Sequence, residues 1–160
     1  ADSVALFHST HANLTGTGTA IAVTSLGVAR TMMRKQKTIK NVVMNLRPRY
    51  LIVPAALETI AAQYVSANYV ANQSSTINPF AGAFEVISEA RLDDNSATAW
   101  YLAADPSMID TIEYCYLEGQ NGVYIETRQG FDVDGMEIKA RLDFAAKAID
   151  YRGLYKNVGA

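Results

Sequence analysis

The chain has 160 residues, 49% of them hydrophobic, which predicts one globular domain or two small lobes with a hydrophobic core. A formal net charge of −2 lacks the basic excess of a dedicated nucleic-acid-binding protein, although a local basic patch remains compatible with it. Cys115 is the single cysteine, which excludes an internal disulfide framework and a zinc site built on several cysteines. No hydrophobic run has the length of a membrane span, so no membrane partner is predicted.

The first twenty residues are small and polar and predict an extended or loop segment. His8 and His11 are three residues apart, a spacing that would bring two imidazoles together on a helical turn. Their segment has no helical pattern and supplies no further ligand, so we interpret both as loop residues. The nearby Ser3 and Ser9 lack the sequence context of a catalytic nucleophile. The sequence therefore predicts no catalytic residue, no cofactor and no metal ion.

A helix is predicted from Thr24 onward, where Leu26, Ala29, Met32 and Met33 recur at helical spacing. Five cations lie on its second half and just beyond it, with no carboxylate among them: Arg30, Arg34, Lys35, Lys37 and Lys40. One interpretation is a solvated helix end, where positive charge is favoured by the helix dipole. The alternative is a basic strip that meets DNA phosphates or an acidic neighbouring subunit.

Residues 50–53 form a short continuous apolar run, which predicts a strand covered on both faces and flanked by two other strands. Pro54 ends this strand and suits the first turn of a helix. The apolar residues that follow recur at helical spacing: Leu57, Ile60, Ala61, Tyr64 and Val65. The sequence therefore predicts a buried strand followed directly by an amphipathic helix, and then a polar link over residues 66–83.

The second half of the chain predicts mainly antiparallel strands. Alternation over residues 84–92 predicts a strand with a hairpin partner at 98–103, then one helical turn through residue 110 and a second hairpin of 111–117 with 123–128. Cys115 is interpreted as a small buried filler. The clearest alternation, over residues 136–144, predicts a last strand with Leu142 on a buried face and Arg141 on a wet face. Together these elements predict an α+β domain.

Several stretches of the chain resemble one protein family. They are LFHSTHANLTGTGTA, SLGVARTMMRKQKT, LRPRYLIVPAALE and the ending GMEIKARLDFAAKAIDYRGLYKN. In this order, and over nearly all 160 residues, they resemble the C-terminal part of Mu-like prophage major head subunits.

The resemblance implies the Hong Kong-type phage capsid fold. Residues 1–53 and 131–160 would form a discontinuous peripheral lobe with the spine helix at 25–37, and residues 54–130 an axial lobe of strands and helices. In the family a flexible N-terminal arm and an extended loop precede the spine helix. Because almost no room is left for them before Thr24, we expect the chain to be the C-terminal part of a longer protein.

The function implied by the resemblance is that of a structural major capsid protein and not an enzyme. Its partners would be copies of itself in hexamers and pentamers, packaged double-stranded DNA bound without sequence specificity, and scaffold and portal proteins. It would assemble in the bacterial host cytoplasm and reside in the virion capsid as an icosahedral shell. One alternative is a non-enzymatic self-associating module, such as a capsid-like encapsulating compartment. The other is a small hydrolase that uses His8 or His11.

Overall fold

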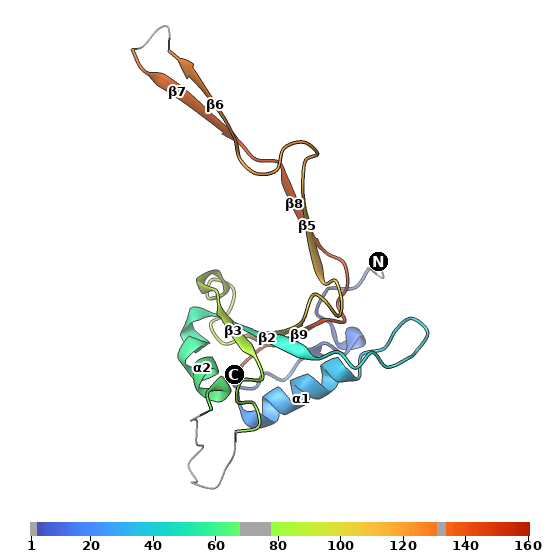
Figure 1. The fold of residues 1–160 in the computed structure, drawn as a ribbon. Helices are drawn as coiled ribbons and strands as arrows, with labels where there is room; N and C mark the ends of the chain where they lie inside the picture. The colour runs from blue at the N-terminus through green and yellow to red at the C-terminus, as the bar shows by residue number, and fades with distance from the viewer. Residues whose placement is uncertain (1–2, 68–77, 131–133) are drawn as a thin grey trace. The chain divides into compact units, whose positions relative to one another are not determined.

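The computed structural model describes residues 3–67, 78–130 and 134–160 (Figure 1). The chain divides into two compact units, which we call the sheet unit (residues 1–111 and 150–160) and the ribbon unit (residues 112–149). These boundaries differ from those of the expected peripheral and axial lobes. The lobes describe where segments lie in an assembled shell, so their assignment stays a prediction. Of the predicted polar link, residues 68–77 lie outside the described residues.

The sheet unit contains a five-stranded sheet in the order β1 (Leu14–Thr15), β9 (Leu154–Asn157), β4 (Trp100–Ala104), β2 (Pro48–Val53) and β3 (Glu85–Ser88). β2 pairs with β3 in parallel and with β4 antiparallel, so it has the two neighbours that its apolar sequence predicted. The predicted hairpin between residues 84–92 and 98–103 is wrong, because β2 lies between β3 and β4. Alternation identifies a strand but not its partner, and the most apolar strand takes an interior place.

Two helices follow the predicted positions closely. α1 (Val23–Arg34) begins where the Ser25 hydroxyl accepts a hydrogen bond from the Ala22 backbone N–H at 2.9 Å. It ends three residues before the predicted end. After Pro54 the chain forms a 3-10 turn, η2 (Ala55–Leu57), and then α2 (Glu58–Val65), while η1 (Ser9–His11) and η3 (Ala90–Leu92) are single 3-10 turns. None of the helices in the described ranges is long and apolar enough to cross a membrane.

The core of the sheet unit lies against one face of the sheet. Leu51, Leu102 and Tyr155 occupy one row across β2, β4 and β9, and all three are fully buried. The indole N–H of Trp100, also fully buried, donates to the Thr19 carbonyl at 3.0 Å. Both helices contribute to the same cluster through Leu26, Ala29, Met33 and Ala61. β9 is therefore an interior strand of the sheet, between β1 and β4.

The ribbon unit consists of two antiparallel two-stranded ribbons. β5 (Ile112–Tyr116) pairs with β8 (Phe144–Ala148), and β6 (Tyr124–Gln129) pairs with β7 (Met136–Arg141). The predicted hairpin of 111–117 with 123–128 is therefore wrong, and the predicted strand 136–144 is two strands with different partners. No residue of this unit is buried among those described, and Leu142 is 52% exposed. Its predicted core face is wrong, because alternation shows that one face is apolar without showing that the same chain covers it.

Residues 106–108 form a turn where the sequence predicted a helical turn. The side chain of Asp105 caps the start of this turn. The Asp105 carboxylate accepts from the Ser107 backbone N–H at 2.9 Å and forms an ion pair with Arg49. The Ser107 hydrogen bond and then the Arg49 guanidinium lower the pKa of Asp105 from 3.8 to about 2.

This lowered pKa predicts an acid-sensitive part of the stability. A carboxyl whose pKa is lower in the folded state stabilises the fold above its unfolded pKa and loses that contribution as the pH falls through its folded pKa. We expect NMR titration of Asp105 to give a midpoint near 2 and Asp105→Asn to flatten the stability profile between about pH 4 and about pH 2. An unchanged profile in Asp105→Asn would contradict this assignment.

Candidate assembly surfaces

His8 and His11 have structural contacts in the sheet unit. The His11 ring stacks on the Tyr151 ring with 3.7 Å between centroids and 7° between planes. The Nδ1 atom of His8 accepts from the Thr10 backbone N–H at 3.2 Å and caps η1. Within the described ranges, no three His, Cys, Asp or Glu residues come together as a potential metal site. The geometry thus gives both histidines a role in packing the N-terminal segment.

Cys115 lies on β5, opposite Ala145 of β8. Its side chain shares the face of Glu113 and Lys147, away from Ile112, Tyr114 and Tyr116, as the alternation predicted. The thiol is exposed, so the predicted role as a buried filler is wrong. Sequence alternation placed the residue on the correct face, but the ribbon has no layer that covers that face.

The five cations of the predicted basic strip divide into two groups. Arg30 and Arg34 are half-buried on α1: the Arg30 guanidinium lies 4.6 Å from the Phe80 ring centroid, and Arg34 Nη1 is 3.5 Å from Asn45 Oδ1. Lys35, Lys37 and Lys40 are exposed. The ion pairs found in the described part of the chain involve none of the five. The three lysines are therefore the cations of the strip that are available to a partner.

These lysines lie on or beside a small hairpin at residues 36–44, which we call the lysine hairpin. Lys37 and Val43 form an antiparallel bridge, and the Met44 backbone N–H donates to the Gln36 carbonyl at 2.9 Å. Asn41, with φ of 63°, takes the left-handed conformation in the turn. Three exposed apolar side chains lie among the lysines: Ile39 (93% exposed), Val42 (61%) and Val43 (56%). Sequence analysis missed this hairpin, whose only local signal is the Asn at its turn.

A hollow of about 530 Å³ adjoins the lysine hairpin. Its lining includes Lys35, Lys37, Ile39 and Arg152. Arg152 is held in place by Asp150, 2.7 Å from its Nη1, and donates from Nε to the Lys37 carbonyl at 2.9 Å. The hollow thus has a basic and partly apolar wall that begins at the base of the hairpin.

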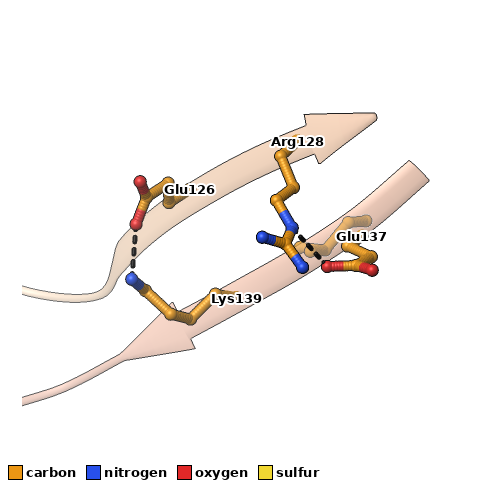
Figure 2. Close-up of a pocket in the computed structure, with 5 residues that line it drawn as sticks. Glu126, Arg128, Glu137 and Lys139 are labelled. Carbon is orange, nitrogen blue, oxygen red and sulfur yellow. Dashed lines mark hydrogen bonds and ion pairs between the residues drawn. The ribbon is translucent and has the colours of Figure 1, made fainter. Parts of the chain in front are cut away.

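One face of the β6–β7 ribbon is charged. Figure 2 shows the two cross-strand ion pairs on this face: Lys139 Nζ is 2.5 Å from a Glu126 carboxylate oxygen, and Arg128 Nε is 2.6 Å from Glu137. Exposed pairs of this kind contribute little to stability, about 0–1 kcal/mol each. They do neutralise one another, so this face has no charge left over for a partner.

The opposite face of the same ribbon is apolar. Because side chains alternate along a strand, this face is shared by Ile125, Thr127, Gln129, Met136, Ile138 and Ala140. Ile125, Met136 and Ile138 are between 63% and 69% exposed. We call these six residues the apolar ribbon face. A two-stranded ribbon is marginally stable in water without a covering layer, so this arrangement suits association and not chemistry.

The β5–β8 ribbon is built in the same way. Its apolar side chains again share one face: Ile112, Tyr114, Tyr116, Phe144 and Ala146. The Tyr116 and Phe144 rings lie 5.5 Å apart at their centroids, and Tyr114 and Tyr116 are 65% and 40% exposed. Aromatic side chains are enriched at protein interfaces because they bury large areas at low entropic cost.

Charge is distributed unevenly along the chain. The ribbon unit contains four Lys or Arg and seven Asp or Glu, a net charge of −3. From Ser3 to Leu57 the chain has seven Lys or Arg and no carboxylate at all. Glu118 and Asp134 of the ribbon unit are exposed and form no ion pair with any described residue. The ribbon unit thus has acidic groups to offer where the lysine hairpin has basic ones.

Comparison with known proteins gives one match. A model of a family described as phage capsid protein matches residues 1–157. No curated protein and no solved structure matches the chain. The family match spans both the sheet unit and the ribbon unit, including the exposed ribbon faces and the lysine hairpin. The chain therefore belongs to this family of phage capsid proteins.

Proposed function

We propose that this capsid protein is the major head subunit of a Mu-like phage or prophage, has the Hong Kong-type fold, and assembles into an icosahedral shell around packaged double-stranded DNA. The observation behind the proposal is the family match over residues 1–157. As a phage capsid protein the chain is structural, associates with copies of itself and belongs to the virion capsid. The Mu-like origin and the Hong Kong-type fold are supported by the sequence resemblance alone.

The exposed surfaces of the ribbon unit agree with a protein that completes its packing among neighbours. Two ribbons with uncovered apolar faces gain stability when another surface covers them, and their charged faces tolerate water. We further propose that residues 54–130 line the centres of hexamers and pentamers as an axial lobe, and that α1 is the spine helix of a peripheral lobe. Scaffold and portal proteins would be its partners during assembly in the host cytoplasm.

Electron microscopy of the gene product that contains this chain, expressed in bacteria, tests the proposal. We expect closed shells of uniform size, because a capsid subunit carries its curvature in its own contacts. Discrete small oligomers without curvature would contradict the shell function. DNA protected from nuclease inside particles from induced cells would separate a phage head from an encapsulating compartment, which holds no packaged genome.

A further inference from the structure

We propose that the apolar ribbon face of one copy docks on the lysine hairpin of a second copy, with Glu118 and Asp134 of the ribbon unit facing Lys37 and Lys40. This inference rests on the proposed function, because it requires copies that associate.

The first support is the match of apolar surfaces. The hairpin exposes Ile39 almost completely, together with Val42 and Val43. The ribbon exposes Ile125, Met136 and Ile138 on one face, while its ion pairs occupy the other. Each side has a small apolar patch that water solvates poorly, and burying the two against each other removes both from water. The charged ribbon face would remain exposed to solvent.

The second support is the opposite charge of the lysine hairpin and of the ribbon unit, whose Glu118 lies in the connection before β6 and whose Asp134 lies in the connection between β6 and β7. Lys37 and Lys40 lie on the hairpin that exposes Ile39, and Lys35 directly precedes it, in a stretch that has no carboxylate. Three of the four cations of the ribbon unit, Arg128, Lys139 and Arg141, form ion pairs with carboxylates of the same unit. Its surplus is acidic, and Glu118 and Asp134 are exposed and unpaired among the described residues. Opposite charges at an interface rim steer the encounter and fix which surfaces meet.

The same observations favour a protein partner over DNA for the hairpin. A surface that binds phosphates needs cations and hydrogen-bond donors, and the DNA backbone, dominated by charged phosphates, offers little apolar surface to cover Ile39. A subunit interface has an apolar centre with a charged rim, which is the composition of the lysine hairpin. The competing outcome is contact between the lysine hairpin and DNA.

A charge-exchange experiment tests the docking in the gene product that contains this chain. One variant has Lys37→Glu and Lys40→Glu, and the other has Glu118→Lys and Asp134→Lys. We expect each variant alone to lower the yield of shells by about tenfold or more, because like charges then meet at every copy of the contact. Arg91→Glu with Lys147→Glu is the control, since it changes the net charge by as much as the hairpin variant and leaves both surfaces intact.

Co-expression of the two variants distinguishes docking between copies from docking within one chain. If hairpin and ribbon meet across copies, a contact between one copy of each variant pairs opposite charges, so we expect the mixture to form mixed oligomers that neither variant forms alone. An odd-numbered ring cannot alternate the two variants at every contact, so full recovery of the shell yield is expected from one chain that carries all four substitutions. Absence of mixed oligomers, with shells restored by all four substitutions in one chain, would overturn the inference in favour of docking within a chain, and failure of the four-substitution chain to form shells would overturn the docking itself. Normal shells from the hairpin variant that fail to retain DNA would overturn it in favour of DNA contact.

A second pair of variants tests the apolar contribution. Ile125→Ser with Ile138→Ser removes the apolar centre of the ribbon face, and Glu126→Ser with Lys139→Ser removes an ion pair from the opposite face. We expect only the first pair to lower the shell yield, and equal yields would overturn the inference.

Failure of the wild-type protein to form shells would instead refute the proposed function, so the two failures are distinguishable. Fluorescence of Trp100, which is buried in the sheet unit, reports whether that unit remains folded in every variant.

Discussion

Leu51→Asp is expected to unfold the sheet unit. Leu51 is fully buried in β2, and its row neighbours Leu102 and Tyr155 are fully buried as well. The substitution removes apolar packing and leaves a carboxylate with no partner in the core, a combined cost of about 5 kcal/mol or more. Because domains of this kind are stable by only about 5–15 kcal/mol, most or all of the net stability would be lost. Urea unfolding followed by Trp100 fluorescence measures the effect.

The matched control for this prediction is Leu142→Asp. The alternation of residues 136–144 had placed Leu142 in a core, where the same substitution would have been equally destructive. The structure shows this leucine 52% exposed in the ribbon unit, so we expect the unfolding transition of the sheet unit to stay within about 0.5 kcal/mol of wild type. A large and equal loss in both variants would show that Leu142 is buried against the sheet unit.

Gly18→Ala is expected to destabilise the sheet unit by forcing apart the segments that contain Gly18 and Gly159. A Cβ atom at Gly18 would lie 1.5 Å from the Gly159 carbonyl oxygen and 2.9 Å from Val158 Cγ2. The nearest obstacle is backbone, which cannot move aside as a flexible side chain does, so the two segments must separate. Overpacking of this kind costs about 1–3 kcal/mol and occasionally more. We expect a lower urea midpoint and a red-shifted Trp100 emission, because the Trp100 indole donates to the carbonyl of the adjacent Thr19.

Gly16→Ala provides the control two residues earlier. No heavy atom lies within 4 Å of a Cβ built at Gly16, and its backbone is not in the left-handed region. Replacing such a glycine reduces the entropy of the unfolded chain, so we expect no loss of stability and a gain of up to about 1 kcal/mol. Similar destabilisation by both substitutions would mean that the segment before α1 tolerates no side chain and that the close approach at Gly18 is not the cause.

Local sequence patterns identified most of the secondary structure correctly. The apolar run ending at Pro54 is β2, and the helical spacing before Lys35 and after Pro54 is α1 and α2. These elements could be predicted because their periodicity and their end signals are confined to a few neighbouring residues. The same reasoning placed Cys115 on the correct side of its strand but assigned both Cys115 and Leu142 to a buried surface, whereas both are exposed. Periodicity distinguishes two faces, whereas burial depends on what lies over them.

Strand partners could not be read from the chain. The short connections after Ser88 and Leu117 suggested hairpins, but β3 pairs with β2, and β5 pairs with the distant β8. Pairing with a distant strand buries further apolar side chains, as Tyr155 is buried beside Leu102. The free energy gained by this burial exceeds the entropic cost of closing a long loop, because that cost grows only slowly with loop length. The lysine hairpin was missed for a related reason, since its short strands have no alternation long enough to detect.

The sequence by itself determined the family of this protein, its helices, its most buried strand and the cations of the basic strip, because each of these is recorded in neighbouring residues or in ordered family-specific stretches. Only the tertiary structure decided which strands pair, that β9 belongs to the core, and that Lys37 and Lys40 stand beside an exposed Ile39. It also decided that the alternating strands of the ribbon unit present their apolar faces to the surroundings. The physical reason is that pairing and burial are properties of contacts between distant segments, and the free energy of those contacts is not encoded in any one of the segments alone.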